Sequence, residues 1–495
     1  MKTFEQPYLT VIPIGSDKPP KNLDTILTWF LEKNGVKIDQ KTMKNDVKEY
    51  RKLSHDLRKM AKGSDLDFVD LSVIEAQNPS IDFRRVANSF INPGRKILEN
   101  KIKERIEAIE NPAFIDEKHR LEKIISKAGP RAVANYLIIF YVDQTIGRLQ
   151  DLAEETCIEL ILNYLPNPAL RVFIRNYFKK ENLEIVSGMI EENREIFKEM
   201  LRESTWLHEE TKKNAILKLE KMGKMVGYPE EFEAEGALDK TYETLNLLED
   251  ESLYTTIRKL NKFNMEQTME YVALESPLDP DPEASLIQVN AFYSQLSNSL
   301  TILAPFIDDP LFDATFPKYA KIAGIGNTVA HQIGHGYDPE GRLADETGEE
   351  KDWWTPEDTV EYEKRTQCMI DQYDNYDDPE YGKNLNGSVT INEMVADNIG
   401  VEVSWNAFKK LDLSKEPRIV GFGNYSIPKL YFRISALEFC RARDDSPDLV
   451  KELTRHHPTD SFRVNGVFSN MKQFADTFNC PVGSPMNPET KCVLF

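Results

Sequence analysis

The sequence predicts a mainly α-helical protein of two domains, and three observations lead to that prediction. The chain has 495 residues, which is too long for one ordinary core. Its first half is rich in Glu, Lys, Leu and Ile at helical spacing, and its second half begins with an alternating, β-prone segment before helical patterns return. Hydrophobic residues make up 40% and charged residues 29%, a balance typical of globular proteins.

The first half shows the pattern of a helical bundle. Residues 98–109 place Leu or Ile at every third or fourth position, as an amphipathic helix does. Residues 185–200 and 209–225 show the same periodicity. We therefore predict a helical domain over residues 1–255, with apolar stripes forming its core and charged faces in solvent.

A domain boundary is predicted between residues 251 and 282. The stretch Ser276-Pro-Leu-Asp-Pro-Asp-Pro282 favours turns and cannot continue a helix. Residues 287–293 then alternate in the manner of a strand. Helical patterns follow up to the C-terminus, so we place the second domain at residues 256–495.

Charge and hydropathy exclude some classes of function. The formal net charge of −20 and the pI near 5.0 disfavour nucleic-acid partners, since such a surface repels phosphates. No segment reaches the roughly 20 apolar residues that a membrane span needs. Residues 1–15 lack the basic start and apolar stretch of a signal peptide. We expect either a cytosolic protein or one whose export segment lies outside this sequence.

Two of the seven histidines are spaced for metal binding. In His331-Gln-Ile-Gly-His335 the imidazoles are four residues apart, on one face of a predicted helix. Both can then reach one tetrahedral zinc ion at about 2.0–2.1 Å. The alternative is a chance pair on a solvent-exposed face. The apolar residues before the pair, and Gly336-Tyr-Asp338 after it, argue against that alternative.

Two further groups of residues could complete such a site. Glu393 and Asp397 are also one helical turn apart, so one carboxylate could bind the metal while the other orients a ligand histidine. Their alternative is a pair of ordinary surface acids. His456-His457 precedes Arg463, and this group could stabilise an oxyanion and hold a peptide carbonyl or carboxylate. Its alternative is a polar surface loop.

Taken in order, these segments resemble the neprilysin and endothelin-converting-enzyme family of zinc metallopeptidases. Residues 331–338 are similar to the family's HExxHGFD helix, and 393–397 to its glutamate-containing helix. Residues 290–294 are similar to its substrate-binding edge strand. The similarity extends from about Arg148 to Phe495. Further matching segments are Trp206–Lys212, Gly227-Tyr-Pro229, Asp352-Trp-Trp354, Thr366-Gln-Cys368, Phe462–Gly466, Met486-Asn-Pro488 and Lys491-Cys492.

The resemblance implies a fold, partners and a compartment. The fold would be a two-domain peptidase: a helical domain over residues 1–255, incomplete relative to the family, and a thermolysin-like catalytic domain with a small β-sheet over residues 256–495. The cofactor would be one zinc ion and the partners small peptides. Family members are usually extracellular or at the cell surface. The substrate and the oligomeric state are not indicated.

The resemblance also implies roles for single residues. It implies a Cys368–Cys492 disulfide, the one pair of cysteines with matching partners in this chain. The metal ligands would be His331, His335 and Glu393, with Asp397 hydrogen-bonded to one ligand histidine, His331. The peptide would be held by Asn290 and Ala291 through its backbone, by Arg463 through a carbonyl, and by His457 at the tetrahedral oxyanion.

Gln332 is the main departure from the family. The family's glutamate at this position takes a proton from the attacking water and delivers it to the leaving amine. A glutamine amide is not basic, and loss of general acid–base help costs roughly 10²–10⁴-fold in rate. The sequence therefore predicts a peptide-binding, zinc-loaded homologue with impaired or no peptidase activity.

Two alternatives to this prediction stay open. An active zinc metalloendopeptidase would need another residue in place of Gln332. A structural helical protein would carry only a vestigial metal site. Asn327 and Thr328 also stand where the family prefers apolar side chains lining the specificity pocket, which implies a more polar pocket here.

Overall fold

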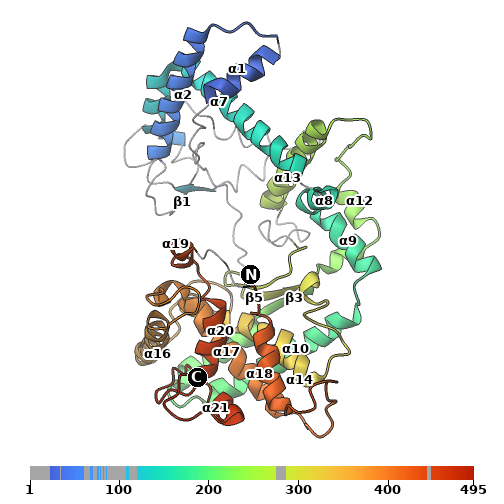
Figure 1. Cartoon of the computed structure of the whole chain (residues 1–495), viewed down its shortest axis with the longest axis vertical. Coiled ribbons are helices and arrows are strands. Elements are labelled where there is room, and N and C mark those ends of the chain that lie inside the picture. The colour runs from blue at the N-terminus through green and yellow to red at the C-terminus, as the bar shows by residue number, and fades with distance from the viewer. Residues whose placement is uncertain are drawn as a thin grey trace. The chain divides into compact units, whose positions relative to one another are not determined.

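The computed structural model describes residues 23–33, 35–60, 67–70, 75–76, 79, 82, 85, 107–110, 120–154, 156–274, 286–442 and 448–495. The chain forms two compact units, each discontinuous in sequence. The larger unit spans residues 167–234 and 284–495, and the smaller unit spans residues 6–166 and 235–283. Both are mainly helical (Figure 1), which confirms the predicted fold class. The units are defined by packing, so the domain limits at residues 255 and 256 stay a prediction.

The smaller unit is organised around helices α2 (Gln40–Met60) and α7 (Arg120–Glu154), which lie side by side (Figure 1). Tyr50 and Tyr136 stack between them with ring centroids 5.4 Å apart. Helix α7 bends at Gly129, which has a non-helical φ of 79°. The next residue is Pro130, which has no backbone N–H and so cannot continue the hydrogen bonds of the helix. The other elements with described bounds in this unit are α1 (Leu23–Lys33), β1 (Asp67–Asp70), β2 (Glu107–Glu110), α8 (Cys157–Tyr164), α12 (Ala237–Thr241) and α13 (Leu253–Leu274).

The helical predictions are partly correct. Helix α10 (Glu181–Glu203) confirms the helix expected over residues 185–200. Helix α11 (Glu209–Lys221) ends earlier than expected, because the next residues form strand β3. Ile109 was wrongly assigned to a helix, since it lies in β2 opposite Phe68 of β1. Residues 98–106 and 276–282 lie outside the described part of the chain. None of the described helices combines the length and apolarity needed to cross a bilayer.

A three-stranded sheet with the order β3-β5-β4 lies in the larger unit. Strand β3 (Gly223–Gly227) runs parallel to β5 (Ser299–Leu303), and β4 (Ala291–Ser294) runs antiparallel to it. The central strand β5 is buried over most of its length. Residues 287–293 were expected to form a strand, but only 291–293 do so, because the chain turns before Ala291. Strand β4 pairs with β5 on one side and is therefore an edge strand of the sheet as described.

Helices α15 (Asn327–His335) and α17 (Gly387–Lys409) pack closely at two glycines. A Cβ atom at Gly334 would lie 2.9 Å from Ala396 Cα, and one at Gly400 would lie 3.0 Å from the backbone nitrogen of His331. Any larger side chain would therefore push the helices apart. This approach brings the histidine face of α15 against the carboxylate face of α17.

Several other helices of the larger unit pack against this pair, α10 among them. A π-helical turn, Ile322–Gly326, leads into α15, and its Gly326 carbonyl accepts a hydrogen bond from Asn193 of α10. The other helices are α9 (Pro166–Asn176), α14 (Lys318–Lys321), α16 (Pro356–Asp374), α18 (Ile427–Leu437), α19 (Leu449–Glu452), α20 (Asp460–Asn470) and α21 (Lys472–Phe478).

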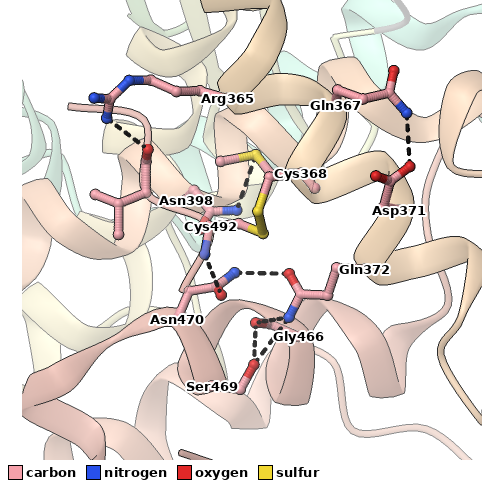
Figure 2. The surroundings of a disulfide bond; sticks show 12 residues. Arg365, Gln367, Cys368, Asp371, Gln372, Asn398, Gly466, Ser469, Asn470 and Cys492 are labelled. Carbon is pink, nitrogen blue, oxygen red and sulfur yellow. Dashed lines mark hydrogen bonds between the residues drawn. A yellow bond between two sulfur atoms is a disulfide. The ribbon is translucent and has the colours of Figure 1, made fainter. Parts of the chain in front are cut away.

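A disulfide joins Cys368 of α16 to Cys492 near the C-terminus (Figure 2), as predicted. Asn470, the last residue of α20, accepts from the Cys492 backbone nitrogen at 3.0 Å and donates to Gln372 of α16 at 2.9 Å. The covalent link and these bonds tie the C-terminal segment and α20 to α16. Helix α20 carries Arg463, so this anchorage fixes one wall of the site.

Candidate metal centre

Helix α15 presents His331 and His335 on one face. Their Nε2 atoms are 3.0 Å apart, and the rings are nearly perpendicular, at 86°. Val329, Ala330 and Ile333 on the same helix are fully buried, so apolar packing fixes the helix behind the histidines. The structure thus brings together the two imidazoles that the spacing indicated.

Glu393 of α17 reaches the same point. Its Oε2 lies 3.5 Å from His331 Nε2, and its Oε1 lies 3.6 Å from His335 Nε2. One ligand atom from each of the three residues falls within a cluster no wider than 4.8 Å. In the described part of the chain, this is the group of His, Cys, Asp and Glu side chains that could hold a metal ion.

Each histidine meets a carboxylate on its far ring nitrogen. His331 Nδ1 lies 2.8 Å from Oδ1 of Asp397, and His335 Nδ1 lies 2.8 Å from Oδ2 of Asp338. Such contacts fix the ring orientation and leave Nε2 free for a metal. Asp338 was not anticipated as a functional residue. Asp338 lies in the turn that follows α15, so helical spacing does not predict its contact with His335.

These contacts give the two histidines different titration behaviour. Burial lowers the pKa of His331, which favours the neutral imidazole that binds metals. Burial acts in the same direction on His335, but the carboxylates of Asp338 and Glu393 outweigh it and raise the pKa of His335. The two imidazoles therefore differ in how readily they lose the proton that a metal ion displaces.

Arg463 closes the carboxylate side of the site. Its Nε and one Nη donate to the two oxygens of Asp397 at 2.7 and 2.6 Å, and the same Nη lies 3.4 Å from Oε2 of Glu393. Although burial opposes ionisation, Arg463 and His331 hold the pKa of Asp397 well below its usual range. The pair keeps Asp397 an anion that can accept from His331.

His457 approaches the same group from the opposite side. Its Nε2 lies 3.3 Å from Oε2 of Glu393, and burial lowers the pKa of His457. Its neighbour His456 lines the same cavity. Both are exposed and lie in a loop, as the alternative expected, and this loop borders the cavity.

All of these residues line one cavity of about 550 Å³ within the larger unit. Asn290 and Ala291 reach it from the start of β4. Gln332 also lines it, and the Gln332 Oε1 atom is buried without a hydrogen-bond partner among the described residues. Glu438, which the sequence did not single out, lines the cavity too. The cavity thus combines three side chains that could bind a metal ion, the neutral amide of Gln332 and the guanidinium of Arg463.

Comparison with known proteins places this geometry in a family. Two sequence profiles, both described as peptidase family M13, match residues 290–494 and residues 30–229. The chain is 32% identical over 342 residues to Neprilysin-11 of Caenorhabditis elegans, covering 68% of this chain and 40% of that protein. It is 29% identical over 401 residues to human Membrane metallo-endopeptidase-like 1, covering 76% of this chain and 51% of that protein.

The fold has solved counterparts. The crystal structure of PepO from Lactobacillus rhamnosis HN001 matches with a TM-score of 0.72 at 18% identity, covering 99% of this chain and 79% of that one. Identity at this level supports the fold alone. The chain spans about half the length of the curated relatives that it matches.

Proposed function

This chain belongs to peptidase family M13, and on that premise we propose that it is a zinc-loaded, peptide-binding homologue of the neprilysin-like metalloendopeptidases, with impaired or no hydrolytic activity. One observation supports this most strongly. The donor atoms of His331, His335 and Glu393 converge on one point. Gln332 lies beside them and occupies the sequence position where the family carries its general-base glutamate.

The donor set fits zinc. Two ligands of a tetrahedral zinc ion at about 2.0–2.1 Å lie roughly 3.3 Å apart. The two Nε2 atoms are 3.0 Å apart, and each lies close to one of the two oxygens of Glu393, at 3.5 Å (Oε2) and 3.6 Å (Oε1), near that value. Two imidazoles and one carboxylate are also the ligand types that zinc takes in hydrolytic sites, where the fourth position stays open. His331, His335 and Glu393 would thus hold the ion.

Gln332 limits what this site can do. A bound zinc ion would polarise a peptide carbonyl and acidify a water molecule. Hydrolysis also needs a side chain that accepts a proton and returns it to the leaving nitrogen. The Gln332 amide can accept a hydrogen bond through Oε1 but cannot take up a proton. Binding and orientation therefore remain possible while proton transfer does not.

The other cavity residues would serve peptide binding. Asn290 immediately precedes the edge strand β4 and Ala291 begins it, and a peptide could add to this edge as a further strand. Arg463 donates to Asp397 from two of its nitrogens. No hydrogen bond joins its third nitrogen to a described residue, so that nitrogen could donate to a peptide carbonyl. His457, held against Glu393, could donate to an oxyanion. The Cys368–Cys492 disulfide supports an oxidising compartment, at the cell surface or outside the cell.

Metal content and turnover of the purified chain test this proposal together. We expect one zinc per chain by elemental analysis and negligible cleavage of fluorogenic peptides. The reversion Gln332→Glu should raise the cleavage rate by about 10²–10⁴-fold. Gln295→Glu is the matched control, because it adds the same charge to the same cavity from the turn after β4. Wild-type turnover at ordinary peptidase rates, or a purified chain without zinc, would contradict the proposal.

A further inference from the structure

A second polar group lies in the same cavity, one helical turn before His331. Thr328 of α15 donates from Oγ1 to both carboxylate oxygens of Glu438, at 3.0 and 2.9 Å. Glu438 is the C-cap residue of α18. Since Thr328 is three residues before His331, the two side chains share a face of α15, with an axial rise of about 4.5 Å between them. Asn327, the neighbouring residue, lines the cavity as well.

This group, which we call the acceptor corner (Asn327, Thr328 and Glu438), lacks a cation. Among the described residues, the Thr328 hydroxyl is the hydrogen-bond partner of the Glu438 carboxylate, and no lysine, arginine or histidine forms an ion pair with it. Arg463 is near enough to act on Glu438 electrostatically, but its close contacts go to Asp397. Oδ1 of Asn327, itself only 6% exposed, has no hydrogen-bond partner among the described residues.

The chemistry of the acceptor corner selects its ligand. The buried Asn327 oxygen lacks a hydrogen-bond donor, and leaving a buried acceptor unpaired costs free energy. The Glu438 carboxylate accepts from a hydroxyl but has no ion-pair partner among the described residues, so a ligand with a positive charge would complement it. A lysine ammonium brings three donors and an arginine guanidinium five, each with a positive charge. An apolar side chain would satisfy neither group, and an acidic one would be repelled by Glu438.

We propose that the acceptor corner is a subsite for a cationic side chain, lysine or arginine, of a peptide bound in the cavity. The inference rests on the proposed function, because it takes a peptide to lie along the cavity beside the metal centre. The residue whose side chain enters this corner would lie next to the peptide group held at His331, His335 and Glu393. A long, flexible cationic side chain can span the single helical turn between the two points.

The state of Glu438 is consistent with this assignment. The residue as a whole is exposed to the cavity, yet protein atoms crowd its carboxyl group, and this desolvation raises the pKa of Glu438. A bound cation would lower that pKa again, because an opposite charge stabilises the ionised form. Binding of a cationic peptide should therefore weaken as the pH falls towards the range where Glu438 is protonated.

Peptide binding to the zinc-loaded full chain tests the subsite. Three fluorescent peptides, identical except for lysine, norleucine or glutamate at one position, are scanned through the sequence and titrated by fluorescence anisotropy. At the matching position we expect lysine to bind about tenfold more tightly than norleucine. Glu438→Gln should remove most of that preference, whereas Glu340→Gln, which removes a charge from the same cavity at a different point, should keep it.

The outcomes separate this inference from the proposed function. If peptides bind but lysine and norleucine are equivalent at every position, or Glu438→Gln leaves the preference intact, the subsite is overturned and peptide binding stands. If no peptide binds the zinc-loaded chain, the proposed function fails and the subsite fails with it. A circular dichroism spectrum of Glu438→Gln that matches the wild type assigns the lost preference to the carboxylate and not to misfolding.

Discussion

The two ends of the cavity differ in how their charged groups are paired. At the metal centre, Asp397 and Asp338 hold the histidines at 2.8 Å, and Arg463 in turn holds Asp397. At the acceptor corner, the hydrogen-bond partner of Glu438 among the described residues is a hydroxyl, and no described cation forms an ion pair with it. A network of oppositely charged and polar groups in close contact restricts its own geometry before a ligand arrives, which lowers the cost of ordering it on binding. An unpaired carboxylate instead favours a ligand that brings the missing charge.

The largest expected effect comes from removing a ligand at the paired end. Glu393→Gln should weaken zinc binding by more than about 100-fold, because the variant loses a charged donor as well as an ion-pair partner for two histidines. Competition with a chromogenic chelator measures the affinity. Glu402→Gln, on the same helix but facing Gln473, is the matched control. Equal zinc affinity in the two variants would remove Glu393 from the ligand set.

A pH experiment tests how the buried Lys218, which binds the loop after Asp338, affects the stability of the chain. Lys218 is fully buried and donates to the Gly341 and Ala344 carbonyls at 2.5 and 2.6 Å. Burial lowers the pKa of Lys218 to about 8, from 10.5. The unfolded chain therefore binds more protons between these values, so stability should rise with pH across this window.

The measurement compares urea unfolding of the wild type with that of Lys218→Gln, which does not titrate, from pH 7 to 10.5. The free energy of unfolding of the wild type should gain roughly 3 kcal/mol over that of the variant. A difference that stays constant with pH would show that Lys218 titrates alike in the folded and unfolded chains.

A smaller effect on zinc binding is expected from Asp338, the carboxylate that contacts the ligand histidine His335 and not the metal. Asp338→Asn should weaken zinc binding by about 10–100-fold, since the amide no longer orients His335 as an anion does. Asp345→Asn is the control, because Asp345 lies in the same loop and accepts from Thr347 without touching a histidine. Isothermal titration with zinc compares the two. An unchanged affinity in Asp338→Asn would mean that helix packing alone orients His335.

The smallest effect is expected at the acceptor corner. Thr328→Val keeps the shape of the side chain but removes the hydroxyl that positions Glu438. One such hydrogen bond contributes about 1–1.5 kcal/mol, so the preference for the lysine peptide should fall by a few-fold without vanishing. The anisotropy titration used for Glu438→Gln measures it. A preference that disappears in Thr328→Val would give the hydroxyl, and not the carboxylate, the main part in recognition.

Local sequence patterns predicted the parts of the site that depend on local structure. The i, i+4 spacing of His331 and His335, and of Glu393 and Asp397, fixes which side chains share a helix face, and the structure has both pairs on helices. Their convergence depends on α15 packing against α17 at Gly334 and Gly400. That contact joins segments some 60 residues apart, so the resemblance to a known family indicated it and the periodicity did not.

Features that depend on distant partners were missed. Strand β3 continues the apolar spacing of α11, and only pairing with β5 decides its conformation. In the same way, Ile109 lies in a strand because β2 pairs with β1. Glu438 is an ordinary glutamate in the sequence, and its position against Thr328, 110 residues away, gives it a place in the cavity.

The central claim, that two imidazoles and one carboxylate bind a single zinc ion beside an inert amide, is tested most directly by anomalous X-ray scattering from crystals of the purified chain at the zinc edge. We expect one strong peak within about 2.1 Å of His331 Nε2, His335 Nε2 and a Glu393 oxygen, with Gln332 beside it and uncoordinated. A map without a peak there, or with the three side chains directed to separate places, would contradict it.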